Sequence, residues 1–323
     1  MISVVLSFRN EAENIATLIA RLDAALTRVA DAYELVFVND ASTDASLAIL
    51  LEERERNRRV KILNMSRRFG VSECVLAGLA SAAGEAVVYM DADLQDPPEV
   101  IPELIARWRA GADVVHTVRT KRRGEAALKM WATRAAYRLI QHGSSIELTV
   151  DAGDFKLLSR KAVDHLLTVR ESDPYLRGLV VWLGFNQAFV PYVRDARHAG
   201  TTHFPFFSRN PWKTFTIGLT SFSFMPVYLC VALAAIGLLS SFLLIAAWAI
   251  LFAQQSSGAA RVGLFGVLTF FWASTIAALA VVGIYVVRIY KDVRRRPAYI
   301  VQDAIGIEKA EPGGAHARLG AER

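Results

Sequence analysis

The chain has 323 residues, enough for one large domain or two smaller ones. Hydrophobic residues make up 53% of it, which is high for a soluble enzyme, and the net charge of +6 suits an anionic membrane surface or phosphorylated ligands. No nucleic-acid-binding module accompanies that charge, so the composition argues against a nucleic-acid partner.

The first half of the chain alternates short apolar runs with helical patterns. We predict strands at residues 3–8, 34–38, 60–64, 86–90 and 113–117, and helices at residues 10–29, 43–56, 71–82 and 99–109, the first capped by Asn10. Strands and helices that alternate in this way form βαβ units. The sequence therefore predicts an α/β fold with a mostly parallel sheet and helices on both faces.

The fourth predicted strand ends in Asp91 and Asp93, and Gln95 and two prolines follow. Because prolines cannot continue a strand, these carboxylates lie at its carboxyl end, where open parallel sheets bind ligands. Carboxylate and amide oxygens suit Mg²⁺ or Mn²⁺, and such a metal usually holds a diphosphate. Taken alone, Asp-x-Asp is equally typical of a turn or a helix cap.

Polar side chains also follow the first two predicted strands, at Asn10-Glu11 and Asn39-Asp40. Asp40 or Ser42 could simply cap the next helix. Capping rarely requires polar groups at three strand ends, however, so we expect them to form one ligand-binding edge.

Four segments together resemble family 2 glycosyltransferases: SVVLSFRNEAENI (residues 3–15), VFVNDASTD (36–44), NMSRRFG (64–70) and MDADLQDPPE (90–99). More narrowly, they resemble the polyprenyl-phosphate glycosyltransferases, which include bacterial undecaprenyl-phosphate glucosyltransferases and dolichol-phosphate mannose synthases. The resemblance covers about residues 2–300 in the same order. It implies a GT-A fold, a nucleotide-sugar donor, a polyprenyl-phosphate acceptor and a homotetramer.

The resemblance also implies the donor site. Asp40 would contact the nucleobase, with Ser7 and Glu11 lining that pocket. Asp91 and Asp93, with Gln95, would hold the metal and the diphosphate. In the nucleotide pocket the chain departs from the family at two positions, where Ser7 replaces the usual proline and Asn39 replaces a frequent second aspartate.

The acceptor site is implied in the same way. Arg119, in a basic loop at residues 119–124, and Arg134 would meet the lipid phosphate, which a planar guanidinium binds at two points. A basic run of this kind is otherwise a solvated surface. Asp154 would face the anomeric carbon and the acceptor. Because a phosphate monoester is already largely ionised, Asp154 would orient the acceptor more than deprotonate it.

A helix at residues 175–183 and a strand at residues 187–192 are predicted next. The segment at residues 192–203 resembles the family's loop that closes over the diphosphate, which makes Arg194 and Arg197 candidates for that contact.

Residues 214–260 and 262–287 contain no charged residue, and each stretch exceeds the roughly 20 residues that cross a bilayer. We predict membrane helices at about residues 226–252 and 262–290, with a connector at residues 253–261. Basic residues precede the first helix and follow the second, so the positive-inside rule places both ends in the cytoplasm. Those residues are Arg209, Lys213, Arg288, Lys291, Arg294, Arg295 and Arg296.

The predicted organisation has four parts. A cytoplasmic GT-A catalytic domain occupies residues 1–203, interfacial amphipathic helices residues 204–225, a transmembrane hairpin residues 226–290, and a cytoplasmic tail, disordered at its end, residues 291–323. The first residues are too few for a signal peptide, and no disulfide is expected between Cys74 and Cys230. We therefore expect a multi-pass protein of the bacterial inner membrane.

Together with the resemblance, these features predict a metal-dependent inverting transferase that moves a hexose to undecaprenyl phosphate. Glucose from UDP-glucose is the first candidate for that hexose and its donor. A GDP-mannose-dependent mannosyltransferase and a transferase of UDP-GlcNAc or a modified sugar are alternatives. A nucleotidyltransferase would instead release pyrophosphate. A membrane scaffold that partners a flippase would not need Asp91, Asp93, Gln95 and Asp154 together.

Overall fold

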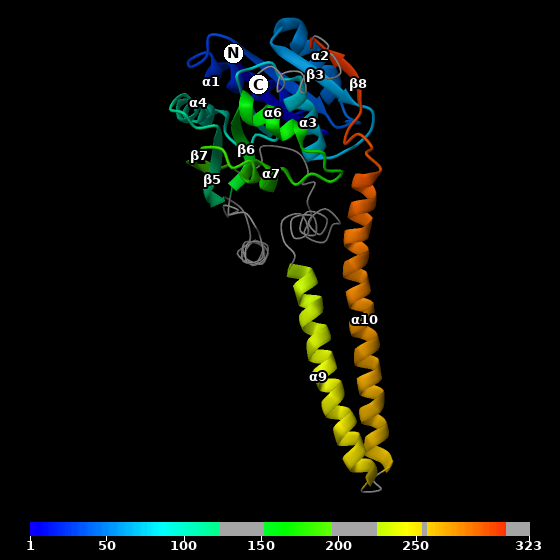
Figure 1. Cartoon of the computed structure of the whole chain (residues 1–323). Coiled ribbons are helices and arrows are strands. Elements are labelled where there is room, and N and C mark those ends of the chain that lie inside the picture. The colour runs from blue at the N-terminus through cyan, green and yellow to red at the C-terminus, as the bar shows by residue number, and fades with distance from the viewer. Residues whose placement is uncertain (123–151, 196–224, 254–256, 308–323) are drawn as a thin grey trace.

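One eight-stranded sheet forms the centre of the globular part (Figure 1). The computed structural model describes residues 1–122, 152–195, 225–253 and 257–307. The strand order is β7-β5-β6-β4-β1-β2-β3-β8. The strands are β1 (Ile2–Phe8), β2 (Tyr33–Asn39), β3 (Val60–Met65), β4 (Ala86–Asp91), β5 (Val114–Arg122), β6 (Ala152–Ser159), β7 (Gln187–Arg194) and β8 (Val301–Ile305).

All described strands except β6 and β8 run in one direction. β1 pairs in parallel with β2 and β4, β2 with β3, and β5 with β7. β6 lies antiparallel between β4 and β5, and β8 lies antiparallel on β3. The mostly parallel sheet is confirmed, and β6 and β8 are strands that were not predicted.

Helices cover both faces of the sheet and create two apolar clusters. α1 (Ile15–Leu26), α2 (Ser46–Arg56) and α4 (Ile101–Arg109), which follows the short helix η1 (Pro98–Val100), pack on one face with Val4 and Leu6. α3 (Val71–Ser81), α6 (Arg160–Thr168) and α7 (Leu176–Trp182) pack on the other with Val5. Because side chains alternate along a strand and helices cover both faces, all seven residues of β1 are buried, and its sequence is mostly apolar with no polar alternation.

Asn10 does not begin the first helix, so that prediction was wrong. α1 begins at Ile15, and Asn10 has a φ of 56°. The Thr43 N–H donates to Asn10 Oδ1 at 2.8 Å, and the Asn10 N–H donates to Ser42 Oγ at 3.0 Å. Asn10 thus joins the loops after β1 and β2, and asparagine tolerates the left-handed conformation that this requires.

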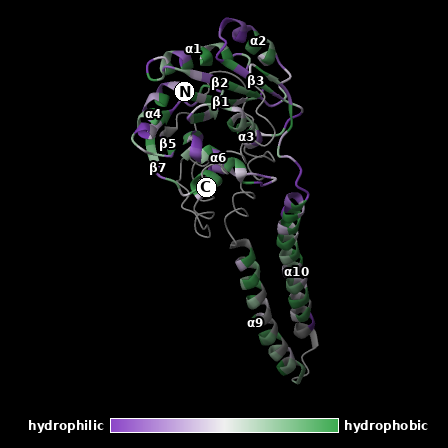
Figure 2. Cartoon of the chain, turned by 45° about the horizontal axis from the view of Figure 1, so that its top comes forward, coloured by the Kyte–Doolittle hydropathy of each residue, from purple (hydrophilic) through white to green (hydrophobic). Residues whose placement is uncertain are grey.

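Two long helices leave the globular part as an apolar hairpin (Figures 1 and 2). α9 (Met225–Ala253) and α10 (Ser257–Val293) contain windows long and apolar enough to cross a membrane, Cys230–Ile250 and Gly266–Val293. Little or nothing of these windows is buried inside the molecule, unlike the core helix of a soluble protein. Both predicted helices are present, but α10 begins at Ser257, so the predicted connector is too long.

The chain returns from α10 to the globular part through a polar junction. This junction consists of Arg288 Nη2 with Glu171 at 3.3 Å, Lys291 Nζ with Asp173 at 2.6 Å, and the Ser172 N–H donating to Asp292 at 2.9 Å. β8 then pairs with β3, so the predicted tail includes a strand. The end of that tail, residues 308–323, and the interfacial segment up to residue 224 lie outside the described residues.

Candidate active site

Three strand ends meet at one edge of the sheet, as the sequence predicted. The register pairs Ser7 of β1 with Val38 of β2 and with Asp91 of β4. Ser7 Oγ donates a hydrogen bond to Asp91 Oδ1 at 3.3 Å. Polar groups from the first and fourth strands are therefore in direct contact.

Asp40 and Glu11 are buried at this edge and are held in place by hydrogen bonds. The Phe69 N–H donates to Asp40 Oδ1 at 2.6 Å, which ties the loop after β3 to the end of β2. Asn14 Nδ2 donates to Glu11 Oε2 at 2.6 Å. The residue before α2 is Ala45, and the N–H of Ser46 at the start of that helix donates to Asp44 Oδ1 at 3.0 Å, so the capping alternative for Asp40 does not hold.

Asp91, Asp93 and Asp96 form an acidic loop at the end of β4. Asp93 Oδ1 accepts a hydrogen bond from the Gln95 N–H at 3.2 Å. Burial raises the pKa of Asp91 to about 7, and the negative charges of Asp93, Asp154 and Asp96 add to that shift. These carboxylates are therefore close enough to repel one another.

Asp154 on β6 makes a two-point ion pair with Arg177 on α7. Arg177 donates from Nε to Oδ1 at 2.8 Å and from Nη2 to Oδ2 at 2.5 Å. Burial alone would raise the pKa of Asp154, but Arg177, followed by Lys156 and Arg119, holds it below its usual range. The carboxylate is therefore both ionised and oriented.

Arg119 lies in β5, so the basic loop that was predicted to begin at this residue does not begin there. β7 supplies pairing partners for Arg119, Lys121 and Arg122, with a register shift at Thr120, which is why the strand continues. A Cβ on Gly153 would lie 2.5 Å from Arg119 Nη2, so glycine leaves room for the guanidinium next to Asp154. Arg119 Nε also donates to Tyr192 Oη at 3.1 Å. Arg119 is thus fixed beside the acidic edge.

Arg194 likewise belongs to a strand, since it is the last residue of β7 and not part of a loop. Its Nε lies 3.3 Å from Asp96 Oδ1, and Tyr192 Oη donates to the same carboxylate. Asp96 is only 1% exposed, so these contacts compensate a buried charge. Arg134 and Arg197 lie outside the described residues.

A profile described as glycosyl transferase family 2 matches residues 3–167, more than half of the chain. The chain belongs to this family. The predicted GT-A fold and glycosyltransferase activity are thereby confirmed, and the edge described above is where this family 2 enzyme has its clustered carboxylates.

Relatives of this family 2 enzyme extend over most of its length. The glycosyltransferase YkcC of Bacillus subtilis (strain 168) is 39% identical over 313 residues, which is 95% of this chain and 94% of that protein. The SfII prophage-derived bactoprenol glucosyl transferase of Shigella flexneri is 34% identical over 278 residues, 83% of this chain and 87% of that protein. These similarities support the resemblance to polyprenyl-phosphate glycosyltransferases.

The similarity to a solved structure is weaker. Glucosyl-3-phosphoglycerate synthase from Mycobacterium tuberculosis, in complex with Mn²⁺, UDP-glucose and phosphoglyceric acid, is 18% identical with a TM-score of 0.45, and the match covers 68% of this chain and 79% of that one. A likeness of that degree does not transfer a ligand to this enzyme.

The family implies a divalent metal, and the acidic loop has suitable donors for one. Among the described residues, no three histidine, cysteine or acidic side chains are arranged to hold a metal ion. Mg²⁺, however, is usually bound through one or two carboxylates together with substrate phosphates. Asp91 and Asp93, which repel each other, fit a metal that is held jointly with a diphosphate. The backbone of Gln95 is held at this loop by its hydrogen bond to Asp93, and the residue is close enough in sequence to add an amide oxygen.

Arg177, Asp96 and Lys156 belong to this site but were not predicted. Asp96 was visible as the third acid after β4, yet nothing in the sequence distinguished it from a turn residue. Lys156 is 1% exposed, and burial lowers its pKa to about 8. Arg177 carries no motif signal, because only the packing of α7 on the sheet brings it to Asp154.

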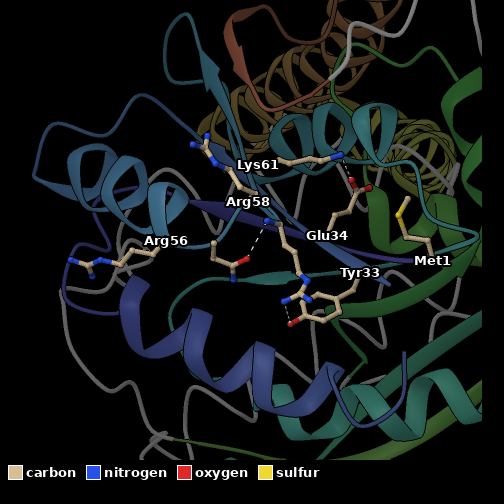
Figure 3. A pocket seen from close by; sticks show the side chains of 8 residues that line it. Met1, Tyr33, Glu34, Arg56, Arg58 and Lys61 are labelled. Atoms are coloured by element: carbon tan, nitrogen blue, oxygen red, sulfur yellow. Dashed lines mark hydrogen bonds and ion pairs between the residues drawn. The ribbon is translucent and has the colours of Figure 1, made fainter. Parts of the chain in front are cut away.

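A separate open cavity of about 540 Å³ lies at the opposite, amino-terminal edge of the sheet (Figure 3). Lys61 pairs there with Glu34 at 2.5 Å, and the Arg59 guanidinium lies 4.7 Å from the centre of the Tyr33 ring. None of the predicted site residues lines it. The lining residues are Met1, Tyr33, Glu34, Arg56, Asn57, Arg58, Arg59 and Lys61.

Proposed function

We propose that this family 2 enzyme transfers a hexose to undecaprenyl phosphate at the cytoplasmic face of the membrane. The first candidate for the donor is UDP-glucose. One observation carries the proposal: the acidic edge and the ionised Asp154 belong to a domain that is tied directly to an apolar helical hairpin. The relatives named bactoprenol glucosyl transferase support the same lipid class and the same sugar.

The donor would bind along the carboxyl edge of the sheet. We assign the nucleoside to Asp40, Glu11 and Ser7, since these side chains are buried at the ends of β1 and β2. Arg194 and Arg197 would contact the diphosphate. Asp91, Asp93 and Gln95 would hold Mg²⁺ or Mn²⁺, which as a Lewis acid neutralises charge on the departing diphosphate.

The transfer itself requires no covalent enzyme intermediate. An oxygen of the acceptor phosphate attacks the anomeric carbon as the bond from that carbon to the diphosphate oxygen breaks, so the configuration inverts. Asp154 is already paired with two-point geometry, which suits orientation of the acceptor better than removal of a proton. Arg119 and Arg134 would hold the acceptor phosphate between them.

The hairpin would keep the site at a headgroup that cannot leave the bilayer. In this proposal α9 and α10 cross the membrane, and the globular part lies in the cytoplasm with the junction at the inner leaflet. Residues 1–203 would be the catalytic domain, residues 204–225 the interfacial segment, residues 226–290 the hairpin and residues 291–323 the tail. A homotetramer remains part of the proposal.

A radiolabel transfer assay tests the function. Membranes that contain the protein receive undecaprenyl phosphate, Mg²⁺ or Mn²⁺, and labelled UDP-glucose, UDP-GlcNAc, UDP-galactose or GDP-mannose in turn, with the Asp154→Asn variant as control. We expect label in the lipid phase from UDP-glucose, lost when a chelator is added. Label from GDP-mannose would indicate a mannosyltransferase, and pyrophosphate release a nucleotidyltransferase. Transfer from no donor would contradict the proposal.

A further inference from the structure

The ion pair between Asp154 and Arg177 joins a strand of the active-site edge to the helix that covers it. We propose that Arg177 is a positioning residue, whose guanidinium fixes the Asp154 carboxylate as an oriented anion next to the reacting groups. This inference rests on the transfer reaction proposed above, and it assigns a role to a residue that no sequence motif marked.

The geometry of the pair restricts the carboxylate in two directions. Both oxygens of Asp154 accept from one planar group, Oδ1 from Nε at 2.8 Å and Oδ2 from Nη2 at 2.5 Å. A single contact would leave the carboxylate free to rotate about its terminal bond, whereas two parallel contacts fix its plane. Each oxygen keeps a further lone pair that can accept a hydrogen bond from a substrate hydroxyl.

The helix that carries Arg177 is itself firmly held. Leu176, Leu179 and Val180 of α7 are buried in the apolar cluster beneath the sheet. Arg177 lies between two of these anchors, so its backbone cannot shift without moving the cluster. The guanidinium is therefore presented from a rigid element and not from a flexible loop.

The surroundings of Asp154 are those of a permanent anion. Lys156 lies two residues further along β6, on the same face of the strand, and is almost completely buried. Arg119 packs against Gly153 from β5. Asp154 is surrounded by the positive charges of Arg177, Lys156 and Arg119. These charges make Asp154 a poor proton acceptor, so its role is better described as a fixed negative charge that aligns neighbouring groups.

Two other roles for Arg177 make different predictions. If it only anchored α7, its loss would lower stability but would leave each folded molecule fully active. If it bound the acceptor phosphate directly, its loss would weaken acceptor binding whether or not Asp154 were present. The experiment therefore needs a measurement on Asp154 itself and a double-mutant comparison.

The first measurement is carboxyl modification, which does not depend on activity. The full-length protein in nanodiscs is treated with a water-soluble carbodiimide and glycine ethyl ester, and peptides containing Asp154 and the exposed Asp31 are quantified by mass spectrometry. We expect Asp154 to be protected in the wild type, modified in Arg177→Met and partly protected in Arg177→Lys, with Asp31 modified equally in all. Equal modification of Asp154 in wild type and Arg177→Met would overturn the proposal.

The second measurement is turnover. We expect Arg177→Met to lower kcat about 100-fold, the scale of a misplaced group, with the KM for the donor unchanged within about two-fold. Arg177→Lys, which keeps the charge, should recover part of that loss. Arg177→Met should have no further effect in the Asp154→Asn background, because the residue acts through Asp154.

A matched control is a second two-point arginine pair, Arg21 with Glu99 at 2.8 and 2.6 Å. Arg21→Met should leave kcat unchanged. Full turnover of folded Arg177→Met, or an equal loss in both Asp154 backgrounds, would refute the positioning role. If the wild type transfers sugar from no donor, the proposed function fails, while the modification experiment still decides whether Arg177 holds Asp154.

Discussion

Asp91 and Asp93 hold like charges close together at the end of one strand. Asp93 is 6% exposed, and Ser7 and the Gln95 N–H supply hydrogen bonds to the two carboxylates. Like charges in a confined site cost free energy, so a chain that keeps them uses them to bind a cation or to shift a pKa. Both possibilities can be tested by isosteric substitution.

Asp93→Asn should abolish sugar transfer, with a loss of at least about 100-fold, because the amide cannot supply the negative charge that the metal and the diphosphate require. The amide oxygen can still accept from the Gln95 N–H, so the melting temperature should change little. Initial rates and thermal melts by circular dichroism measure the two effects. Asp31→Asn, at an exposed position, is the control. Undiminished turnover would refute the assignment of Asp93.

Asp91 should make stability fall as pH rises. Burial and the neighbouring carboxylates raise its pKa from 3.8 to about 7 in the folded protein. Between these two values the folded state binds more protons than the unfolded state, so stability present near pH 4 is lost as pH rises through 7. Without divalent metal the loss is on the order of a few kcal/mol.

The measurement compares melting temperatures of the wild type and Asp91→Asn at pH 5 and pH 8, in the presence of a chelator. Asp91→Asn should be the more stable of the two at pH 8, since it has no charge to bury, and the difference should shrink at pH 5. Added Mg²⁺ should restore the wild type only. If Asp91→Asn were less stable than the wild type at both pH values, the negative charge of Asp91 would not be destabilised by burial and by the neighbouring carboxylates.

The residues at strand ends could be predicted, and their partners could not. Asp40 and Asp91 follow apolar runs of strand length, and parallel strands bring such ends together whatever the details of packing. The contact of Asp154 with Arg177 depends instead on how α7 lies across β6, which no local pattern encodes. Asp96 was recognisable as an acid but not as a buried one.

At the scale of elements, β1–β4 could be predicted from the local sequence, whereas β6 and β8 could not. The first four strands are mostly apolar, with at most two charged or amide side chains each, and their predicted bounds lie within about two residues of those observed. β6 contains Asp154 and the buried Lys156, which interrupt its apolar pattern. β8 is an edge strand with exposed residues at its centre, and short polar edge strands resemble loops in sequence.

β8 should be necessary for the fold, and the residues after it should not. β8 covers the edge of β3, and Tyr299, Val301 and Ile307 pack against the apolar cluster that contains α3. A chain that ends after Arg296 should therefore expose an unpaired strand edge, melt several degrees lower and aggregate. A chain that ends after Ile307 is the matched control and should behave as the full-length protein. Equal melting temperatures for the two truncations would show that β8 adds no stability.

At the scale of the whole molecule, the polar junction connects the apolar hairpin to the candidate active site. Glu171 and Asp173 pair with Arg288 and Lys291 at the end of α10, and the loop that carries these acids leads directly into α7, the helix of Arg177. On the other side, β8 pairs with β3, whose following loop contacts Asp40. The end of α10 is therefore linked to both the acceptor side and the donor side of the proposed site.

Exchange of one ion pair tests this link. Arg288→Glu places two acids together at the junction, because Arg288 and Glu171 are both partly buried, with side chains 19% and 26% exposed. A partly buried like-charge pair costs on the order of 1–3 kcal/mol, so the junction should open in this variant. We therefore expect about a tenfold loss of sugar transfer in vesicles. We also expect protease to cleave the exposed segment between α10 and β8. The double variant Glu171→Arg with Arg288→Glu should regain most of the activity. Arg296→Glu is the control, because it makes the same change of charge in the same basic cluster but outside the junction. If it lowered transfer as much as Arg288→Glu, the effect would come from the membrane surface and not from the junction.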